Sequence, residues 1–363
     1  MKDSRFSQMN IEEIPTEGFE RVVHCTDPDS GLNAFISVHD TTLGPALGGV
    51  RMLPYASGEE ALADAMRLAK AMTYKAAVAR TGQGGGKGVI VADPSEKTEA
   101  MMLAMGRLIK ALDGQFIAAE DMNMTVADLE TMARETRWVS GLSHERGSSG
   151  NPSPLTALGC LVGIQASAEE VFGTESLSGR CVAVQGVGAV GGALAKLCIE
   201  EGAEVAVCDL DGEKARRFAD SNGATALEGP DACLSYPCDI LSTCARGGIL
   251  NAETIPKLQC RIVAGAANNQ LDEPGDAERL QKRGILYAPD YVINAGGIIN
   301  IACEFAPAGY SDAAARERVM GIGPTLKDVL RISREEDIST AAAADRLAEA
   351  RLAEGRAANP PGS

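Results

Sequence analysis

The first part of the chain alternates strand-like and helix-like patterns of apolar residues. Residues 20–39 form two apolar runs joined by the turn-forming sequence DPDSG, which predicts a pair of β-strands. Residues 58–74 and 98–112 repeat apolar positions at helical spacing. Between these two helices, a glycine cluster at 82–88 precedes an apolar strand at 89–92. The pattern predicts an N-terminal α/β domain.

A second pattern begins after the linker-like sequence GSSGNPSP at 147–154. Residues 181–209 place a strand, a glycine turn, a helix and another strand in succession. Short strand-like runs then recur at 239–242, 261–264 and 285–287. This βαβ rhythm is typical of a doubly wound parallel sheet, and a chain of 363 residues is long enough to hold two domains.

The sequence from residue 311 onward is polar and predicts helices. It ends in AANPPGS at 357–363, a segment that we expect to fray.

The composition narrows the class of protein. The hydrophobic fraction of 45% and the charged fraction of 23% are those of a globular protein. The formal charge of −16 argues against a nucleic-acid partner and an anionic membrane surface. Ten cysteines form no CxxC pair and only three histidines are present, so no metal site is expected. The N-terminus lacks the apolar segment of a signal peptide, and no apolar run approaches ~18 residues. We therefore expect the protein to be located in the reducing cytoplasm.

The glycine turn of the second domain predicts a dinucleotide site. Gly186, Gly188 and Gly191 form a GxGxxG motif between a strand and a helix. The first glycine makes the tight turn, the second lets the backbone approach a pyrophosphate, and the third lets helix and strand pack closely. Asp209 follows the next strand, where a carboxylate would bind the adenosine ribose and favour NAD over NADP. The alternatives are a turn that binds nothing and, for the nearby Asp211, the cap of the following helix.

The first domain holds two lysines and an acid of chemical interest. Lys75 lies near the end of the first helix, and Lys87 follows three consecutive glycines. Two lysines in one pocket disfavour each other's charge, so one could act as an acid–base group near neutral pH, although a solvated loop lysine is the simpler interpretation. Asp121 lies either at the C-terminal edge of a strand or at the N-cap of a helix that begins near Thr125.

These residues fall in a set of motifs that resembles the Glu/Leu/Phe/Val dehydrogenases. The motifs occur in the order of that family from about residue 30 to 305: GPALGGVR at 44–51, MTYKAA at 72–77, GGGK at 84–87, ED at 120–121, GVGAVGG at 186–192, GAANN at 265–269 and NAGG at 294–297. An ordered set of this length is far more specific than any single motif.

The resemblance implies a role for each site residue. Lys75 would bind the substrate carboxylate, Lys87 would activate the water that attacks the imino carbon, and Asp121 would shuttle protons to and from the amino group. The implied NAD contacts are Gly186, Val187, Gly188, Ala189, Val190, Gly191 and Asp209 in the phosphate and ribose sites, together with Thr156, Ala245, Asn268 and Asn294.

The substrate pocket can be argued from single positions. Leu47 stands where glutamate dehydrogenases have a lysine, and a leucine cannot compensate a buried side-chain carboxylate. Ala119 stands where members acting on aromatic amino acids often have glycine. The expected substrate-binding set is Lys75, Leu47, Gly48, Gly49, Ala119, Asn268, Ile298 and Ile301. We therefore expect NAD-dependent oxidative deamination of leucine, valine or isoleucine.

Two alternatives stay open. Several stretches, such as GILYAPDYVINAGG, also resemble tryptophan dehydrogenases of the family, so phenylalanine or tryptophan could be the substrate. A non-catalytic NAD-binding regulator is the other alternative, although neither lysine nor Asp121 has been lost.

The resemblance also implies an arrangement of domains and subunits. Residues 1–148, with C-terminal helices at about 308–355, would form the substrate, catalytic and oligomerisation domain, and residues 149–307 the NAD-binding Rossmann domain. A homo-oligomer, either an octamer or a dimer, is expected. Two positions depart from the family: Gln83 lies in a TGQ sequence where an apolar residue and proline are usual, and Arg246 replaces an apolar residue. We expect a more mobile loop at 81–83, and for Arg246 either a cofactor contact or exposure to solvent.

Overall fold

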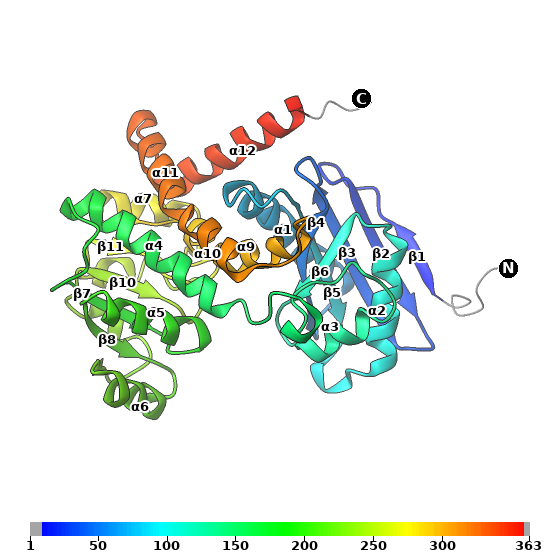
Figure 1. Ribbon diagram of the computed structural model, residues 1–363, viewed down its shortest axis with the longest axis horizontal. Helices are drawn as coiled ribbons and strands as arrows, with labels where there is room; N and C mark the ends of the chain where they lie inside the picture. Colours follow the sequence, from blue (N-terminus) through cyan, green and yellow to red (C-terminus); the bar gives the residue numbers. More distant parts are fainter. Residues whose placement is uncertain (1–8, 359–363) are drawn as a thin grey trace. The chain divides into compact units, whose positions relative to one another are not determined.

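A computed structural model describes residues 9–358, and the expected frayed tail lies largely outside this range (Figure 1). The chain forms two compact units. The first runs to Asn151 and includes Ile301–Tyr310 and the residues from Ala348 onward. The second comprises Pro152–Asn300 and Ser311–Leu347.

The first unit contains a mixed six-stranded sheet with the order β1-β2-β3-β5-β4-β6. β3 pairs antiparallel with β2 and β5, whereas β4 runs parallel to both β5 and β6. The strands are β1 (Asn10–Glu13), β2 (Arg21–Asp27), β3 (Leu32–Asp40), β4 (Ala46–Leu53), β5 (Gly84–Val91) and β6 (Phe116–Glu120). The helices are α1 (Gly58–Val78), α2 (Glu99–Ala111) and α3 (Val126–Met132). The expected N-terminal α/β domain and its first strand pair are confirmed.

The helix α1 covers one face of this sheet. Ser57 caps its first turn by accepting a hydrogen bond from the Glu60 amide, as expected for a serine N-cap. Its buried stripe consists of small residues, including Ala61, Ala65 and Ala69. Small side chains let the helix approach the strands closely, and this places α1 directly on β3 and β5.

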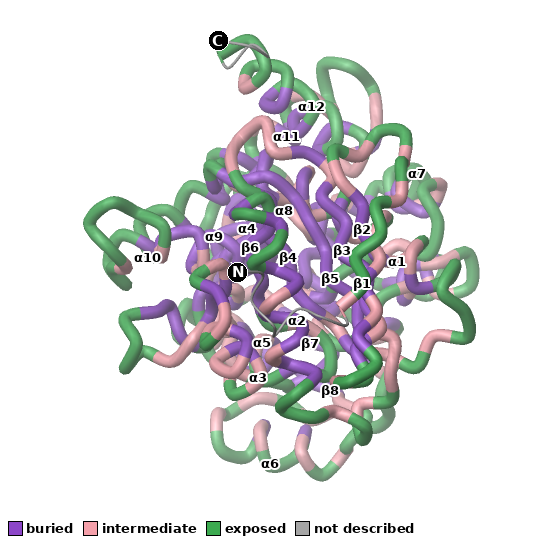
Figure 2. The backbone as a smooth tube through the Cα atoms, turned by 90° about the vertical axis from the view of Figure 1, so that its right-hand side faces the viewer, coloured by how far each residue is buried: buried purple, intermediate pink, exposed green. Residues whose placement is uncertain are grey.

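The glycine segment 84–88 is a buried strand and not the loop that its composition suggested. A Cβ atom on Gly85 would lie 2.0 Å from the Thr73 amide nitrogen of α1. One on Gly86 would lie 2.7 Å from the Phe116 ring. The glycines thus serve close packing on both faces of β5, and Figure 2 shows this part of the sheet buried.

The second unit contains a parallel sheet with the order β12-β11-β10-β7-β8-β9. The first strand of the sheet in the chain, β7, lies at its centre, and the later strands extend to both sides, which is the doubly wound arrangement of a Rossmann domain. Its strands are β7 (Cys181–Gln185), β8 (Glu204–Cys208), β9 (Thr225–Ala226), β10 (Ile240–Thr243), β11 (Ile262–Val263) and β12 (Leu286–Tyr287). Its helices include α4 (Ser153–Phe172), α5 (Ala189–Glu200), α6 (Gly212–Asn222), α7 (Gly275–Lys282) and α8 (Asp290–Ile293). The expected fold class is confirmed.

The C-terminal helices divide differently from our expectation. They are α9 (Gly296–Ala302), α10 (Asp312–Met320), α11 (Ile322–Glu336) and α12 (Thr340–Ala358). We expected 308–355 beside the first domain, whereas α10 and α11 group with the second unit because both pack on α4, and α11 also packs on α8. The residues of α12 from Ala348 onward do group with the first unit.

Among the residues that the structure describes, α4 is long and apolar enough to cross a membrane by length and composition. However, 61% of its most apolar window is buried, and the helix packs against α5 and α11. Its apolar composition is therefore that of a core helix.

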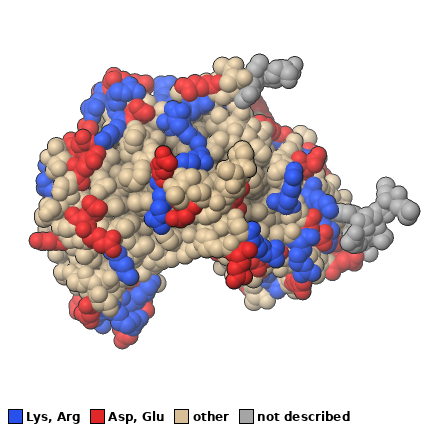
Figure 3. All heavy atoms as spheres, viewed as in Figure 1, with Lys and Arg blue, Asp and Glu red and all other residues tan. Residues whose placement is uncertain are grey.

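On the face drawn in Figure 3, acidic and basic side chains are interspersed.

Candidate active site

Several of the expected site residues share one face of the first sheet. Successive side chains of a strand point to opposite faces, so Leu47, Gly49 and Arg51 of β4 point to the same side. Gly49 pairs with Ala119 on the neighbouring strand β6. On the opposite neighbour, β5, the register places Lys87 next to Gly49. Since Gly85 meets α1, Lys87 also lies on the α1 face of the sheet. Gly48 alternates to the other face.

Lys87 and Asp121 form a buried ion pair on this face. The Lys87 side chain is 6% exposed, and its Nζ donates to Asp121 Oδ2. Asp121 follows the last residue of β6, whereas Thr125 caps α3, so the alternative of Asp121 as a helix cap is excluded. A Cβ atom on Gly49 would lie 2.6 Å from Asp121 Cβ. Only glycine at position 49 leaves Asp121 this position.

Arg51 is the second cation on Asp121, and no role was predicted for it from the sequence. Its Nε lies 3.0 Å from Asp121 Oδ2, and its Nη1 lies 3.0 Å from Asp64 Oδ2. Asp64 also accepts from Tyr55 Oη at 2.7 Å and from Arg67 at 2.6 Å. Alternation along β4 could have indicated Arg51, because it lies two residues beyond Gly49.

The surroundings shift the pKa values of the pair. Burial favours the neutral form of Asp121, but Lys87 and Arg51 outweigh it and lower the pKa of this carboxyl to about 2. Burial lowers the pKa of Lys87, Asp121 opposes this, Arg51 adds to it, and the net pKa lies below its ordinary value. We expected a lowered lysine pKa from repulsion by Lys75; the cation that contributes here is Arg51, and burial is the larger cause.

Lys75 projects from the flank of α1 that carries Asp64. The two residues are eleven positions apart, which corresponds to about 20° around a helix axis. Because Asp64 reaches Arg51, this flank faces β4. Lys75 is half-buried in the last turn of α1, near the same face as Lys87.

The glycine turn of the second unit fits a dinucleotide. Gly186 has φ +93°, in the left-handed region, and a Cβ on Gly191 would lie 2.0 Å from the Gly186 carbonyl oxygen. By contrast, a Cβ on Gly188 would meet nothing within 4 Å, so the space beside this residue is open. Gly188 is also the N-cap of α5 and supplies no side-chain cap, which leaves the first N–H groups of this helix for an anion.

Asp209 is held at the edge of this turn. It follows β8, and its Oδ2 accepts a hydrogen bond from the Val187 amide at 2.8 Å. Burial is offset by the amides of Val187 and Asp211 and by Lys214, and the pKa of Asp209 lies below its ordinary value. The carboxylate is thus ionised and oriented towards the turn. Asp211 caps α6, as the sequence suggested.

The other expected cofactor residues lie at the carboxyl edge of the second sheet or near it. Asn294 Nδ2 donates to Asn268 Oδ1 at 2.8 Å and to the Ala266 carbonyl at 3.1 Å, so these two carboxamides form one group. Thr156 lies in the first turn of α4, and its hydroxyl donates to the Pro152 carbonyl at 3.0 Å. Ala245 is exposed and lies against Gly186.

The isoleucines expected in the substrate pocket both lie on α9. Ile298 is buried and groups with the second unit, whereas Ile301 is half-buried and groups with the first.

The two departures from the family pattern have clear positions. Gln83 is 4% exposed, and its Oε1 has no hydrogen-bond partner in the described part of the chain. Arg246 follows Ala245 and is largely exposed, and its Nη2 lies 3.0 Å from Asp231 Oδ2. Asp231 in turn accepts from Gln185, the last residue of β7, at 2.8 Å. Arg246 is therefore held near the end of β7, which leads into the glycine turn, while most of its surface faces solvent.

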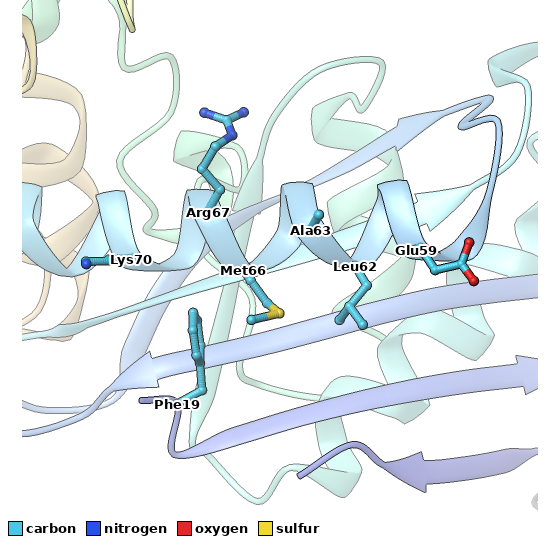
Figure 4. A pocket seen from close by; sticks show the side chains of 7 residues that line it. All are labelled: Phe19, Glu59, Leu62, Ala63, Met66, Arg67 and Lys70. Carbon is cyan, nitrogen blue, oxygen red and sulfur yellow. The ribbon is translucent and has the colours of Figure 1, made fainter. Parts of the chain in front are cut away.

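A groove of about 430 Å³ lies along α1 (Figure 4). Phe19, Leu62 and Met66 point into it, and Glu59 and Lys70 lie at its ends. None of the expected site residues lines it, so it is separate from the Lys87–Asp121 site.

Comparisons with known proteins cover most of the chain. The family model "Glu/Leu/Phe/Val dehydrogenase, dimerisation domain" matches residues 19–138, and "Glutamate/Leucine/Phenylalanine/Valine dehydrogenase" matches 211–355. Leucine dehydrogenase of Geobacillus stearothermophilus is 49% identical over 96% of this chain and 94% of its own length. Valine dehydrogenase of Streptomyces virginiae is 44% identical over 93% and 95%. The crystal structure of L-tryptophan dehydrogenase from Nostoc punctiforme superposes with a TM-score of 0.82 at 43% identity, covering 93% of this chain and 97% of that one.

A Rossmann domain and a separate unit with a buried lysine–aspartate pair fit a dehydrogenase, and the matched family implies a nicotinamide cofactor. The chain belongs to the Glu/Leu/Phe/Val dehydrogenase family and is an amino-acid dehydrogenase.

Proposed function

We propose that this enzyme oxidatively deaminates a branched aliphatic L-amino acid with NAD, giving the 2-oxo acid, ammonia and NADH, and catalyses the reverse reductive amination. The observation that carries the proposal is the buried Lys87–Asp121 pair on the same face of the sheet as the apolar side chains of Leu47 and Ala119. Charged groups for the amino-acid head thus adjoin an apolar surface for an aliphatic side chain.

Each of the three charged residues has a separate task in this proposal. Lys75 would bind the substrate carboxylate as a cation. Asp121, held ionised with a pKa of about 2, would orient the substrate amino group and take up a proton only transiently. The lowered pKa of Lys87 makes loss of its proton easier, and the resulting neutral amine would draw a proton from the water that attacks the imino carbon. The bound nicotinamide would supply the acceptor for the hydride that leaves the substrate Cα.

The proposed cofactor is NAD, and Asp209 supports this choice. Its ionised carboxylate would accept hydrogen bonds from the adenosine ribose and repel a 2′-phosphate. The open space beside Gly188 and the free amides of α5 would hold the pyrophosphate. Thr156, Asn268 and Asn294 would lie near the nicotinamide.

Leu47 and Ala119 support the choice of substrate. Leu47 is 1% exposed and offers no cation for a side-chain carboxylate, which disfavours glutamate. The Ala119 methyl group takes up space on the same face of the sheet and would disfavour an aromatic ring. An aromatic amino acid remains the second candidate because tryptophan dehydrogenase is similar to this chain at 43% identity. Leucine, isoleucine and valine differ by one methylene or less, which is worth only ~1–3 kcal/mol in such a pocket.

We also propose a homo-oligomer in the cytoplasm. The match of residues 19–138 to a dimerisation domain supports an oligomer. The ten free thiols suit a reducing compartment.

The experiment is an assay of NADH formation with a panel of L-amino acids at alkaline pH. We expect turnover of leucine, valine and isoleucine, and a loss of ~10²–10⁴-fold in Lys87→Met. Lys110→Met, which removes an exposed lysine near the end of α2, is the control and should retain activity. Turnover of phenylalanine or tryptophan alone would shift the substrate class, and NAD binding without any turnover would support the regulator instead.

A further inference from the structure

Arg51 lies at the centre of the charged network of the first unit. Its side chain is 15% exposed and contacts two carboxylates, Asp121 through Nε and Asp64 through Nη1, each at 3.0 Å. The guanidinium therefore bridges the strand edge that carries Asp121 and the helix α1.

We propose that Arg51 is a positioning residue for the dehydrogenase reaction, which holds the Asp121 carboxylate ionised and turned towards Lys87. This inference rests on the function proposed above for Lys87 and Asp121.

The geometry assigns the two oxygens of Asp121 to different partners. Both Lys87 and Arg51 donate to Oδ2. Within residues 9–358, no hydrogen bond to Oδ1 is found, so this oxygen is available to a substrate amino group. Two cations on one oxygen leave the carboxylate little freedom to rotate. The substrate would thus meet a fixed acceptor.

The other end of Arg51 is anchored as firmly. Asp64 accepts from Arg51, from Tyr55 and from Arg67, and this holds its pKa below the ordinary value although burial acts in the opposite direction. Because the guanidinium fork is planar, fixing Nη1 on Asp64 also fixes the direction of Nε towards Asp121. A lysine at position 51 would keep the charge but lose this second contact.

The charges that face Asp121 come from three elements: Lys87 from β5, Arg51 from β4, and Asp64 from α1 beyond Arg51. Lys75 projects from the same flank of α1 as Asp64. Arg51 lowers the pKa of both Asp121 and Lys87. Removing this cation should therefore raise both pKa values, and a base that must be neutral to act would then need a higher pH.

The experiment compares Arg51→Met and Arg51→Lys with Arg67→Met. Arg67 binds the other oxygen of Asp64 but is 58% exposed and does not touch Asp121, so its removal is a matched control. We expect kcat/KM of Arg51→Met to fall ~10–100-fold, the loss of a hydrogen bond to a charged group. The acid limb of its pH profile should move up by roughly one unit. Arg51→Lys should restore the position of the acid limb but not the full kcat/KM. Arg67→Met should resemble the wild type in both.

Three results would overturn the proposal: a pH profile of Arg51→Met that coincides with the wild type, an equal shift in Arg67→Met, or Arg51→Lys with full activity. The KM for NAD should not change, and fluorescence of the single tryptophan, Trp138, reports folding of the same unit. If Arg51→Met does not fold, the rate and pH profile of Arg51→Lys decide the question. Failure of the proposed function is a separate outcome, since wild-type enzyme would then turn over no amino acid.

Discussion

The substitution Asp121→Asn should make the stability of the protein strongly dependent on pH. It leaves Lys87, with a side chain only 6% exposed, without its anion, whereas Arg51 keeps Asp64. Breaking a buried ion pair by removing one partner costs ~3–5 kcal/mol. Lysine can limit this cost by losing its proton on folding. For a lysine with an unfolded pKa of about 10.4, full deprotonation costs roughly 4–5 kcal/mol at pH 7 and about 2 kcal/mol at pH 9.

The direction of this pH dependence follows from the number of protons that each state binds. In the variant the folded state holds Lys87 neutral, while the unfolded state binds its proton up to about pH 10.4. Stability rises with pH wherever the unfolded state binds more protons. The stability deficit of Asp121→Asn relative to the wild type should therefore shrink by about half or more between pH 7 and pH 9.

The assay is urea unfolding at both pH values, followed by fluorescence of Trp138, which lies in the same unit as Asp121. Glu99→Gln is the control, because its ion pair with Arg134 is more than half exposed on both sides. Such a pair contributes little, so this variant should match the wild type at both pH values. A deficit of Asp121→Asn that is constant or grows with pH would refute the claim that Lys87 is buried beside this carboxylate.

Three further predictions concern single positions. Arg246→Leu removes the cation held near the glycine turn. The KM for NAD should therefore rise ~3–10-fold at low salt, with kcat unchanged. A difference in KM that persists at high salt would contradict this electrostatic role. Ala119→Gly should raise kcat/KM for phenylalanine relative to leucine by ~10-fold, measured with both substrates, and an unchanged ratio would remove this residue from the pocket. Gly85→Ala places a methyl group 2.0 Å from a backbone nitrogen of α1, so it should cost ~3 kcal/mol or more in unfolding free energy. Gly212→Ala, where a Cβ meets nothing within 4 Å, is its control and should leave the melting temperature nearly unchanged.

The Rossmann unit could be predicted from the sequence because its signals are local. The glycine turn, the flanking strand and helix, and Asp209 lie within about 30 residues, and the expected fold class is confirmed. The cap of α6 by Asp211 was also readable, since it depends only on the next few residues.

The features that the sequence did not reveal depend on distant neighbours. Glycine has a low strand propensity, so 84–88 resembles a loop until Phe116 and the backbone of α1 are seen against it. Arg51 gains its importance from Asp64 and Asp121, which follow it by 13 and 70 positions. The grouping of α10 and α11 depends on their packing against α4, which no local pattern shows.

The glycine strand β5 restricts how this enzyme can change in evolution. The positions on both sides of Lys87 admit no methyl group without moving α1, Phe116 or Val50. The strand that holds the ammonium is therefore closed to variation by substitution. Under the proposed function, new substrate ranges would arise at other positions of the pocket, such as 47 and 119, while the proposed reacting lysine stays in place.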